Sequence, residues 1–140
     1  MDALGTLARL ARREVDEERR ALAALDGRRK ALLERIEELG RNSAREAEAA
    51  TGLPGGPMLL SSYLGARRAR QRSLRAEIEA LEEQRLVQLE RLAAKRLEAR
   101  RLERLGERRS ATAERLAARR EAKALDDLVS ARTARREGLT

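Results

Sequence analysis

The stretch TGLPGGPMLL, residues 51–60, interrupts a chain that is otherwise rich in helix-forming residues. It holds both prolines of the chain and three of its nine glycines, Gly52, Gly55 and Gly56. Proline donates no backbone hydrogen bond and disfavours helix in the residue before it, while glycine allows a positive φ. The stretch therefore predicts a turn over residues 51–57 that reverses the chain between two helices.

The composition on either side of this turn is typical of long helices and coiled coils. Of the 140 residues, 40% are charged, Phe and Trp are absent, and there is a single Tyr. Ala, Leu, Arg and Glu dominate, so large apolar side chains can supply only a narrow seam between helices. We therefore expect an all-α protein with an elongated shape.

Several classes of function are disfavoured by the residue types that the chain lacks. Without Cys or His, it offers neither a thiolate metal site nor the commonest general base. It also contains no glycine-rich phosphate loop and no nucleophile elbow. We therefore expect a protein that is not an enzyme and that has no cofactor, metal or small-molecule substrate.

The apolar residues recur at intervals of three and four on both sides of the turn. The first series is Leu4, Leu7, Ala11, Val15, Leu22, Leu25, Leu32, Ile36 and Leu39, with Glu18 and Arg29 as polar exceptions. The second is Leu60, Leu64, Leu74, Ile78, Leu81, Leu89 and Leu92, with Arg67 and Gln71 as exceptions. These series predict helices over about 3–50 and 58–136, in a single elongated domain, 1–140, built as an antiparallel coiled-coil hairpin.

The second predicted helix is much longer than the first and should overhang it. Antiparallel pairing about the turn places Leu33 opposite Leu74 and Val15 opposite Leu92, and the first helix ends opposite about Gly106. The residues after Gly106 then have no partner from their own chain. They carry a small apolar cluster, Leu125, Leu128 and Val129. We expect this overhang to contact another molecule.

The net charge of +8 comes entirely from the part after the turn. Residues 1–50 hold 11 basic and 11 acidic side chains, whereas residues 51–140 hold 21 basic and 13 acidic ones. The segment KRLEARRLERLGERR, residues 95–109, is especially basic. It could match an acidic protein surface, bind phosphates, or simply be a solvated helix face with paired Glu and Arg.

Three stretches together resemble the FliJ family of flagellar export proteins. They are LARLARREVDEERRAL at residues 7–22, SSYLGARRARQRSL at 61–74 and EAKALDDLVSARTARR at 121–136. The last resembles a family element of Lys, an aliphatic residue and two acidic residues, followed by small and basic residues. The order of a short helix, a turn and a longer helix is also similar, so the resemblance covers nearly the whole chain.

The resemblance implies an antiparallel coiled coil like the central stalk of rotary ATPases. Its implied partners are the hexameric flagellar export ATPase, the cytoplasmic domain of the export gate, and export chaperones whose cycling it assists. It implies gate docking through Tyr63, Leu64, Arg67, Arg70 and Leu74. It implies ATPase docking through Lys123, Leu125, Asp126, Asp127, Leu128, Arg132 and Arg135.

The resemblance implies a cytoplasmic location, at the inner face of the cytoplasmic membrane at the flagellar base. No apolar run approaches the ~20 residues that span a bilayer. The N-terminal MDALGTLARLARREV lacks the features of a secretory signal.

Other readings of the same residues stay open. The chain could be a stalk protein of an injectisome, a self-associating rod, or a basic coiled coil that binds nucleic acid. The last is disfavoured because no aromatic residues are interleaved with the basic ones for stacking. Tyr63 could instead cap the end of the seam, and the Leu125 cluster could contact a second copy of the chain.

Overall fold

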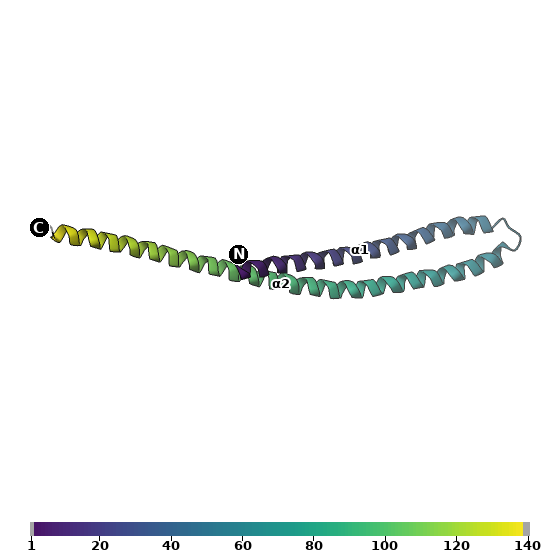
Figure 1. The fold of residues 1–140 in the computed structure, drawn as a ribbon. Helices are drawn as coiled ribbons and strands as arrows, with labels where there is room; N and C mark the ends of the chain where they lie inside the picture. Colours follow the sequence, from purple (N-terminus) through teal and green to yellow (C-terminus); the bar gives the residue numbers. More distant parts are fainter. Residues whose placement is uncertain (1, 139–140) are drawn as a thin grey trace. The chain divides into compact units, whose positions relative to one another are not determined.

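The computed structural model describes residues 2–138, and they form two helices joined by a short turn (Figure 1). Helix α1 spans Ala3–Ala50 and α2 spans Gly56–Gly138. The predicted all-α fold of two packed helices, the second one longer, is confirmed. Helix α2 begins two residues earlier than expected, because Pro57 is tolerated in a first turn, where its missing N–H has no helical partner.

The chain divides into two compact units, which are described separately. The hairpin unit comprises residues 13–96 and contains the turn. The terminal unit comprises residues 1–12 together with residues 97–140, of which 2–12 and 97–138 are described.

The turn is closed by backbone hydrogen bonds and depends on two of its glycines. The Leu53 N–H donates to the Ala50 carbonyl at 3.3 Å, and the Gly56 N–H donates to the Leu53 carbonyl at 3.0 Å. Gly55 has a φ of 75°, which other L-residues rarely adopt. A Cβ at Gly56 would overlap the Ala50 carbonyl oxygen, so only glycine fits this close approach. The expected reversal of the chain is therefore built by Gly55 and Gly56.

A narrow apolar seam joins the two helices of the hairpin unit. Its buried apolar residues are Val15 from α1 and Leu74, Ile78, Leu81 and Leu92 from α2. Each was expected in the seam, and each lies on one face of its helix at intervals of three or four residues, or multiples of them. Burial of this stripe is what stabilises helices that charge and propensity alone would leave marginal.

The prediction was wrong at two positions in this seam. Leu89 is 36% exposed, and Gln88 is buried in its place. Intervals of four and three from Leu81 lead through Arg85 to Gln88, and the Gln88 amide donates to the backbone carbonyl of Glu18 at 3.1 Å. It also bonds the Glu18 carboxylate, so the buried amide is satisfied. Leu33, which was expected opposite Leu74, is 41% exposed, whereas Leu32 of the predicted series is half-buried.

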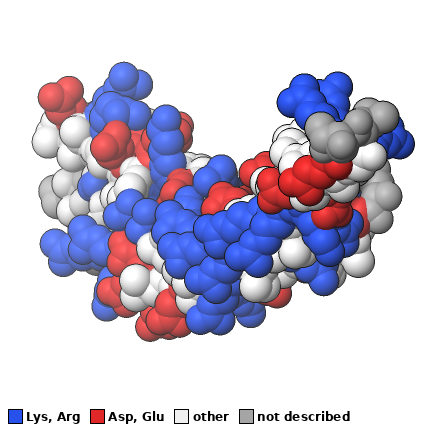
Figure 2. All heavy atoms as spheres, turned by 90° about the vertical axis from the view of Figure 1, so that its left-hand side faces the viewer, with Lys and Arg blue, Asp and Glu red and all other residues white. Residues whose placement is uncertain are grey.

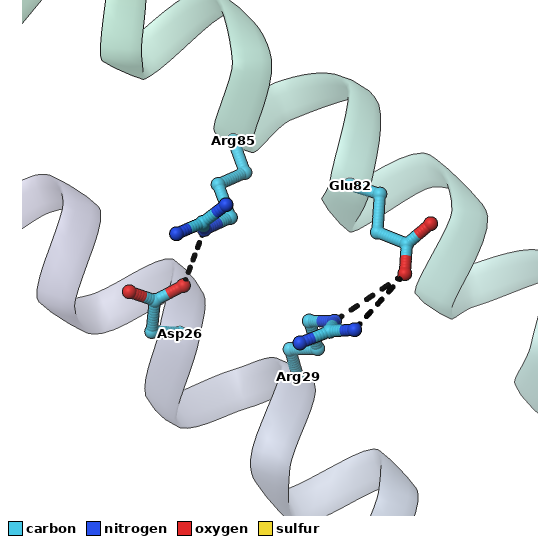
Figure 3. A network of polar contacts seen from close by, with 4 residues as sticks. All are labelled: Asp26, Arg29, Glu82 and Arg85. Carbon is cyan, nitrogen blue, oxygen red and sulfur yellow. Dashed lines mark hydrogen bonds and ion pairs between the residues drawn. The ribbon is translucent and has the colours of Figure 1, made fainter.

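Ion pairs flank the seam and confirm that the helices run antiparallel. Arg85 contacts Asp26 at 2.7 Å, and Arg29 contacts Glu82 at 3.3 Å (Figure 3). Later residues of α1 thus pair with earlier residues of α2. These side chains are roughly half exposed to solvent, so each pair contributes at most ~1 kcal/mol and acts mainly to set the register.

In the terminal unit, the first residues of α1 pack on α2 up to Gly106. Ala11 and Ala99 are buried, and a Cβ at Gly106 would lie 4.0 Å from the Leu4 side chain. Leu7, expected in the seam, is 50% exposed, and Ala8 is half-buried instead. The Asp2 carboxylate accepts a hydrogen bond from the Leu4 N–H at 3.4 Å, as an N-cap does.

Beyond Gly106, α2 soon leaves the cover of α1, and the last described contact is Arg109, which lines a groove with Leu4 and Leu7 and lies 3.6 Å from the Asp2 carboxylate. Every described residue from Glu107 to Gly138 is exposed except Ala111, which is half-buried. We call residues 107–138 the terminal segment. The predicted overhang of the second helix is therefore confirmed.

Candidate docking surfaces

Tyr63, the only aromatic residue, connects the two helices near the turn. It is half-buried on α2, and its hydroxyl forms a hydrogen bond with the carboxylate of Glu46 on α1. This hydrogen bond, followed by burial and by the negative charge of Glu46, raises the pKa of Tyr63, while Arg67 opposes the shift. The phenol is therefore neutral near pH 7 and can act as a hydrogen-bond donor.

The raised pKa predicts how Tyr63 titrates. In the folded protein the absorbance of the phenolate should appear above pH 10.0, its ordinary midpoint. The pKa of Tyr63 is higher in the folded chain than in the unfolded chain, so the contact with Glu46 stabilises the fold fully below pH 10.0. This stabilisation is lost as the pH rises through the folded pKa. The single Tyr makes the titration unambiguous. Glu46→Gln should move the midpoint down, and a folded midpoint at or below that in urea would contradict the contact.

The other residues implied in gate docking differ in their exposure. Leu64 and Arg67 are half-buried beside Tyr63, and Arg70 is exposed. The Arg67 guanidinium packs near Gly40 of α1, and its Nε is buried with no hydrogen-bond partner among the described residues. Leu74 is only 4% exposed, so it holds the helices together, and any effect on docking would be indirect.

The end of the hairpin unit also carries an apolar surface that sequence reasoning missed. A shallow groove there is lined by Ala49, Ala50, Leu53, Leu59, Leu60 and Tyr63, among others. Leu53, Met58 and Leu59 are largely exposed. The signal was present, because large apolar residues are unusual in a turn of glycine and proline, but the helical periodicity ends there and does not assign them a face.

The terminal segment presents a second apolar surface. Leu125, Leu128 and Val129 are between 62% and 66% exposed, and their spacing places them on one face of α2. The remaining residues implied in ATPase docking are exposed around them: Lys123, Asp126, Asp127, Arg132 and Arg135. The structure thus brings all seven predicted residues together on little more than three turns of one uncovered helix.

The segment that carries this apolar face has an excess of basic side chains. The terminal segment holds nine basic and six acidic residues. Figure 2 shows one face of the molecule, on which Lys and Arg cover more of the surface than Asp and Glu. An acidic partner surface with apolar hollows would match this combination.

The described residues offer no group of Asp and Glu arranged to hold a metal ion. Within residues 2–138, neither helix has a stretch that is long and apolar enough to cross a membrane.

Comparison with known proteins gives one match. The family model for the flagellar FliJ protein matches residues 1–138, which is nearly the whole chain. No curated protein and no solved structure matches the chain.

Proposed function

The chain belongs to the FliJ family of flagellar export proteins, and from this premise we propose that it acts as a stalk between the export ATPase and the export gate. The family is a non-enzymatic coiled-coil component of the flagellar export apparatus, and so is this chain. The match to a flagellar family also favours this apparatus over an injectisome.

The terminal segment is the part that we propose to enter the hexameric ATPase. The observation that carries this proposal is a helix that leaves the cover of α1 and then exposes Leu125, Leu128 and Val129. Apolar side chains of this size are usually covered when they gather on one face. Lys123, Arg132 and Arg135 would steer the segment toward acidic surface.

The region of Tyr63 is the part that we propose to contact the cytoplasmic domain of the export gate. Tyr63, Leu64 and Arg67 lie together there, and Tyr and Arg are enriched in interface hot spots. The bond between Tyr63 and Glu46 ties this surface to both helices, so contact there would be sensitive to their packing. Contact with export chaperones, and a position at the inner face of the cytoplasmic membrane, complete the proposal.

A three-component binding experiment tests the linking role. The full chain is immobilised through a tag on its N-terminus and exposed to the ATPase, to the gate domain, and to both together. A stalk should retain both proteins at once, with neither displacing the other. Mutual displacement would contradict the proposal, because it would place both partners on one surface.

A further inference from the structure

The turn end of the hairpin unit combines exposed apolar side chains with an excess of arginine. Met58 is 83% exposed, the highest value for a large apolar side chain among the described residues. Leu59 is 66% exposed and Leu53 is 58% exposed. None of the three contributes to the seam, so packing between α1 and α2 does not explain them.

Arginines follow directly on α2, with no acidic residue among them. Between Glu48 and Glu77 the chain has no Asp or Glu. The same stretch contains five arginines: Arg67, Arg68, Arg70, Arg72 and Arg75. Such a stretch stands out in a chain where 24 acidic residues are otherwise spread along both helices.

Three of these arginines share one exposed face. Arg68, Arg72 and Arg75 are separated by four and three residues, which places them in a row along α2. All three are exposed. Arg68 stands ten residues after Met58, or roughly 15 Å along the helix. An arginine side chain reaches about half that distance back toward the turn, so the basic row begins close behind the apolar end.

A phospholipid bilayer with anionic headgroups fits this arrangement. Apolar side chains can enter the boundary between headgroups and acyl chains, while arginines bind the phosphates behind them. A protein interface would normally include aromatic anchors, and the exposed apolar side chains here, Leu53, Met58 and Leu59, include none. Nucleic acid would use the arginines but leave Leu53, Met58 and Leu59 in water.

We propose that the end of the hairpin unit, formed by Leu53, Met58, Leu59, Arg68, Arg72 and Arg75, binds the surface of an anionic phospholipid bilayer. The surface uses residues outside the set implied in gate docking, and it does not rest on contact with the ATPase or the gate. A purified chain and vesicles alone therefore test it, whatever the outcome for the stalk.

Co-sedimentation of the full chain with vesicles is the first test. Vesicles of phosphatidylcholine with roughly a quarter of phosphatidylglycerol should bind the chain, and pure phosphatidylcholine should bind it far more weakly. Replacing Arg68, Arg72 and Arg75 with Gln should weaken binding about a hundredfold, at about a fivefold loss for each arginine. High salt should also weaken vesicle binding by the wild-type chain, because it screens the charges on both surfaces.

The chain offers a matched control for this charge change. Arg108, Arg115 and Arg119 are exposed on the terminal segment and are separated by seven and four residues, so they also share a face. Their replacement with Gln removes the same charge and should weaken vesicle binding by less than about threefold, since none of them belongs to the proposed surface. Equal loss in both triple variants would overturn the proposal, because net charge alone would explain it.

A tryptophan reporter tests the apolar contact directly, because the chain has no Trp. In a Leu59→Trp variant, the emission should shift to the blue on anionic vesicles. In a Leu116→Trp variant, with the reporter in the terminal segment, it should not shift. Met58→Ser combined with Leu53→Ser should weaken binding at least about tenfold.

Three further results would also overturn the proposal: no binding to anionic vesicles, a shift at position 116 but not at 59, and full binding by the arginine triple variant. If the chain does not bind vesicles, and the arginine triple variant no longer binds the gate domain, the arginines belong to a protein interface. If the chain binds nucleic acid through the same residues but does not bind vesicles, the arginines bind the phosphates of nucleic acid. Both outcomes would also reject the bilayer.

Discussion

Replacing Leu125 and Leu128 together with Glu is expected to weaken binding to the flagellar export ATPase at least about a hundredfold. Covering two leucine side chains that are 62% and 66% exposed contributes on the order of 3 kcal/mol to binding, and the variant loses this contribution. Two new carboxylates also lie beside Asp126 and Asp127, where an acidic partner would repel them. Affinity measured by biolayer interferometry or calorimetry checks the expectation.

The helix itself should survive this change. Glu has a helix propensity close to that of Leu, and neither side chain is packed against α1. Far-ultraviolet circular dichroism should therefore show the same helix content in both proteins. A loss of helix together with a loss of binding would leave the docking role without support, so Leu125→Ser with Leu128→Ser provides a second variant that adds no charge.

A matched control lies on the hairpin unit. Leu86 and Val87 are 62% and 50% exposed, and their replacement with Glu changes the charge by the same amount. This control should retain ATPase binding within about threefold, since surface changes away from an interface have small effects. If the Leu125 and Leu128 variant binds as tightly as the control, the terminal segment is not the ATPase contact. The remaining alternative is that this apolar face forms a dimer interface. Light scattering on the wild-type chain tests it, because a dimer would have twice the mass of the single chain.

Most of the fold could be predicted because it depends on local signals. Two prolines and clustered glycines fix the turn, and periodic leucines fix which face of each helix is buried. The overhang followed from the unequal lengths on either side of the turn. The single-domain organisation and both docking sites remain predictions, since they concern how parts and partners come together.

The errors have a common physical cause. At position 89 a leucine beside the seam was preferred over Gln88 on hydrophobicity alone, and Leu33 was placed opposite Leu74 from an assumed centre of the turn. Gln88 is buried because Glu18 across the seam supplies an acceptor, and such a pairing depends on the register between the helices. The apolar end of the hairpin was missed for a related reason, since Leu53 and Met58 lie outside any repeating pattern.

The second large effect is expected in the seam, where Leu92→Ala should lower the free energy of unfolding by about 2–3 kcal/mol. Leu92 is 4% exposed and lies between two cross-helix contacts, Gln88 with Glu18 and Lys95 with Glu14 at 3.0 Å. Truncation of Leu92 leaves a cavity, and the two cross-helix contacts on either side limit how far the helices can move together to fill it. The seam is only one layer thick, which keeps the cost at the lower end of the range for buried leucines.

The same substitution at Leu86 isolates burial from every other consequence of the change. Leu86 is on the same helix six residues earlier but is 62% exposed, so Leu86→Ala should alter the free energy of unfolding by less than about 0.5 kcal/mol. Urea unfolding followed by circular dichroism gives both values. A loss of about 2 kcal/mol lowers the ratio of folded to unfolded chains about thirtyfold. This is a large share of the stability of a two-helix unit with so few buried side chains. If both variants lose the same amount, helix propensity and the flanking ion pairs hold the hairpin, and the narrow leucine seam does not.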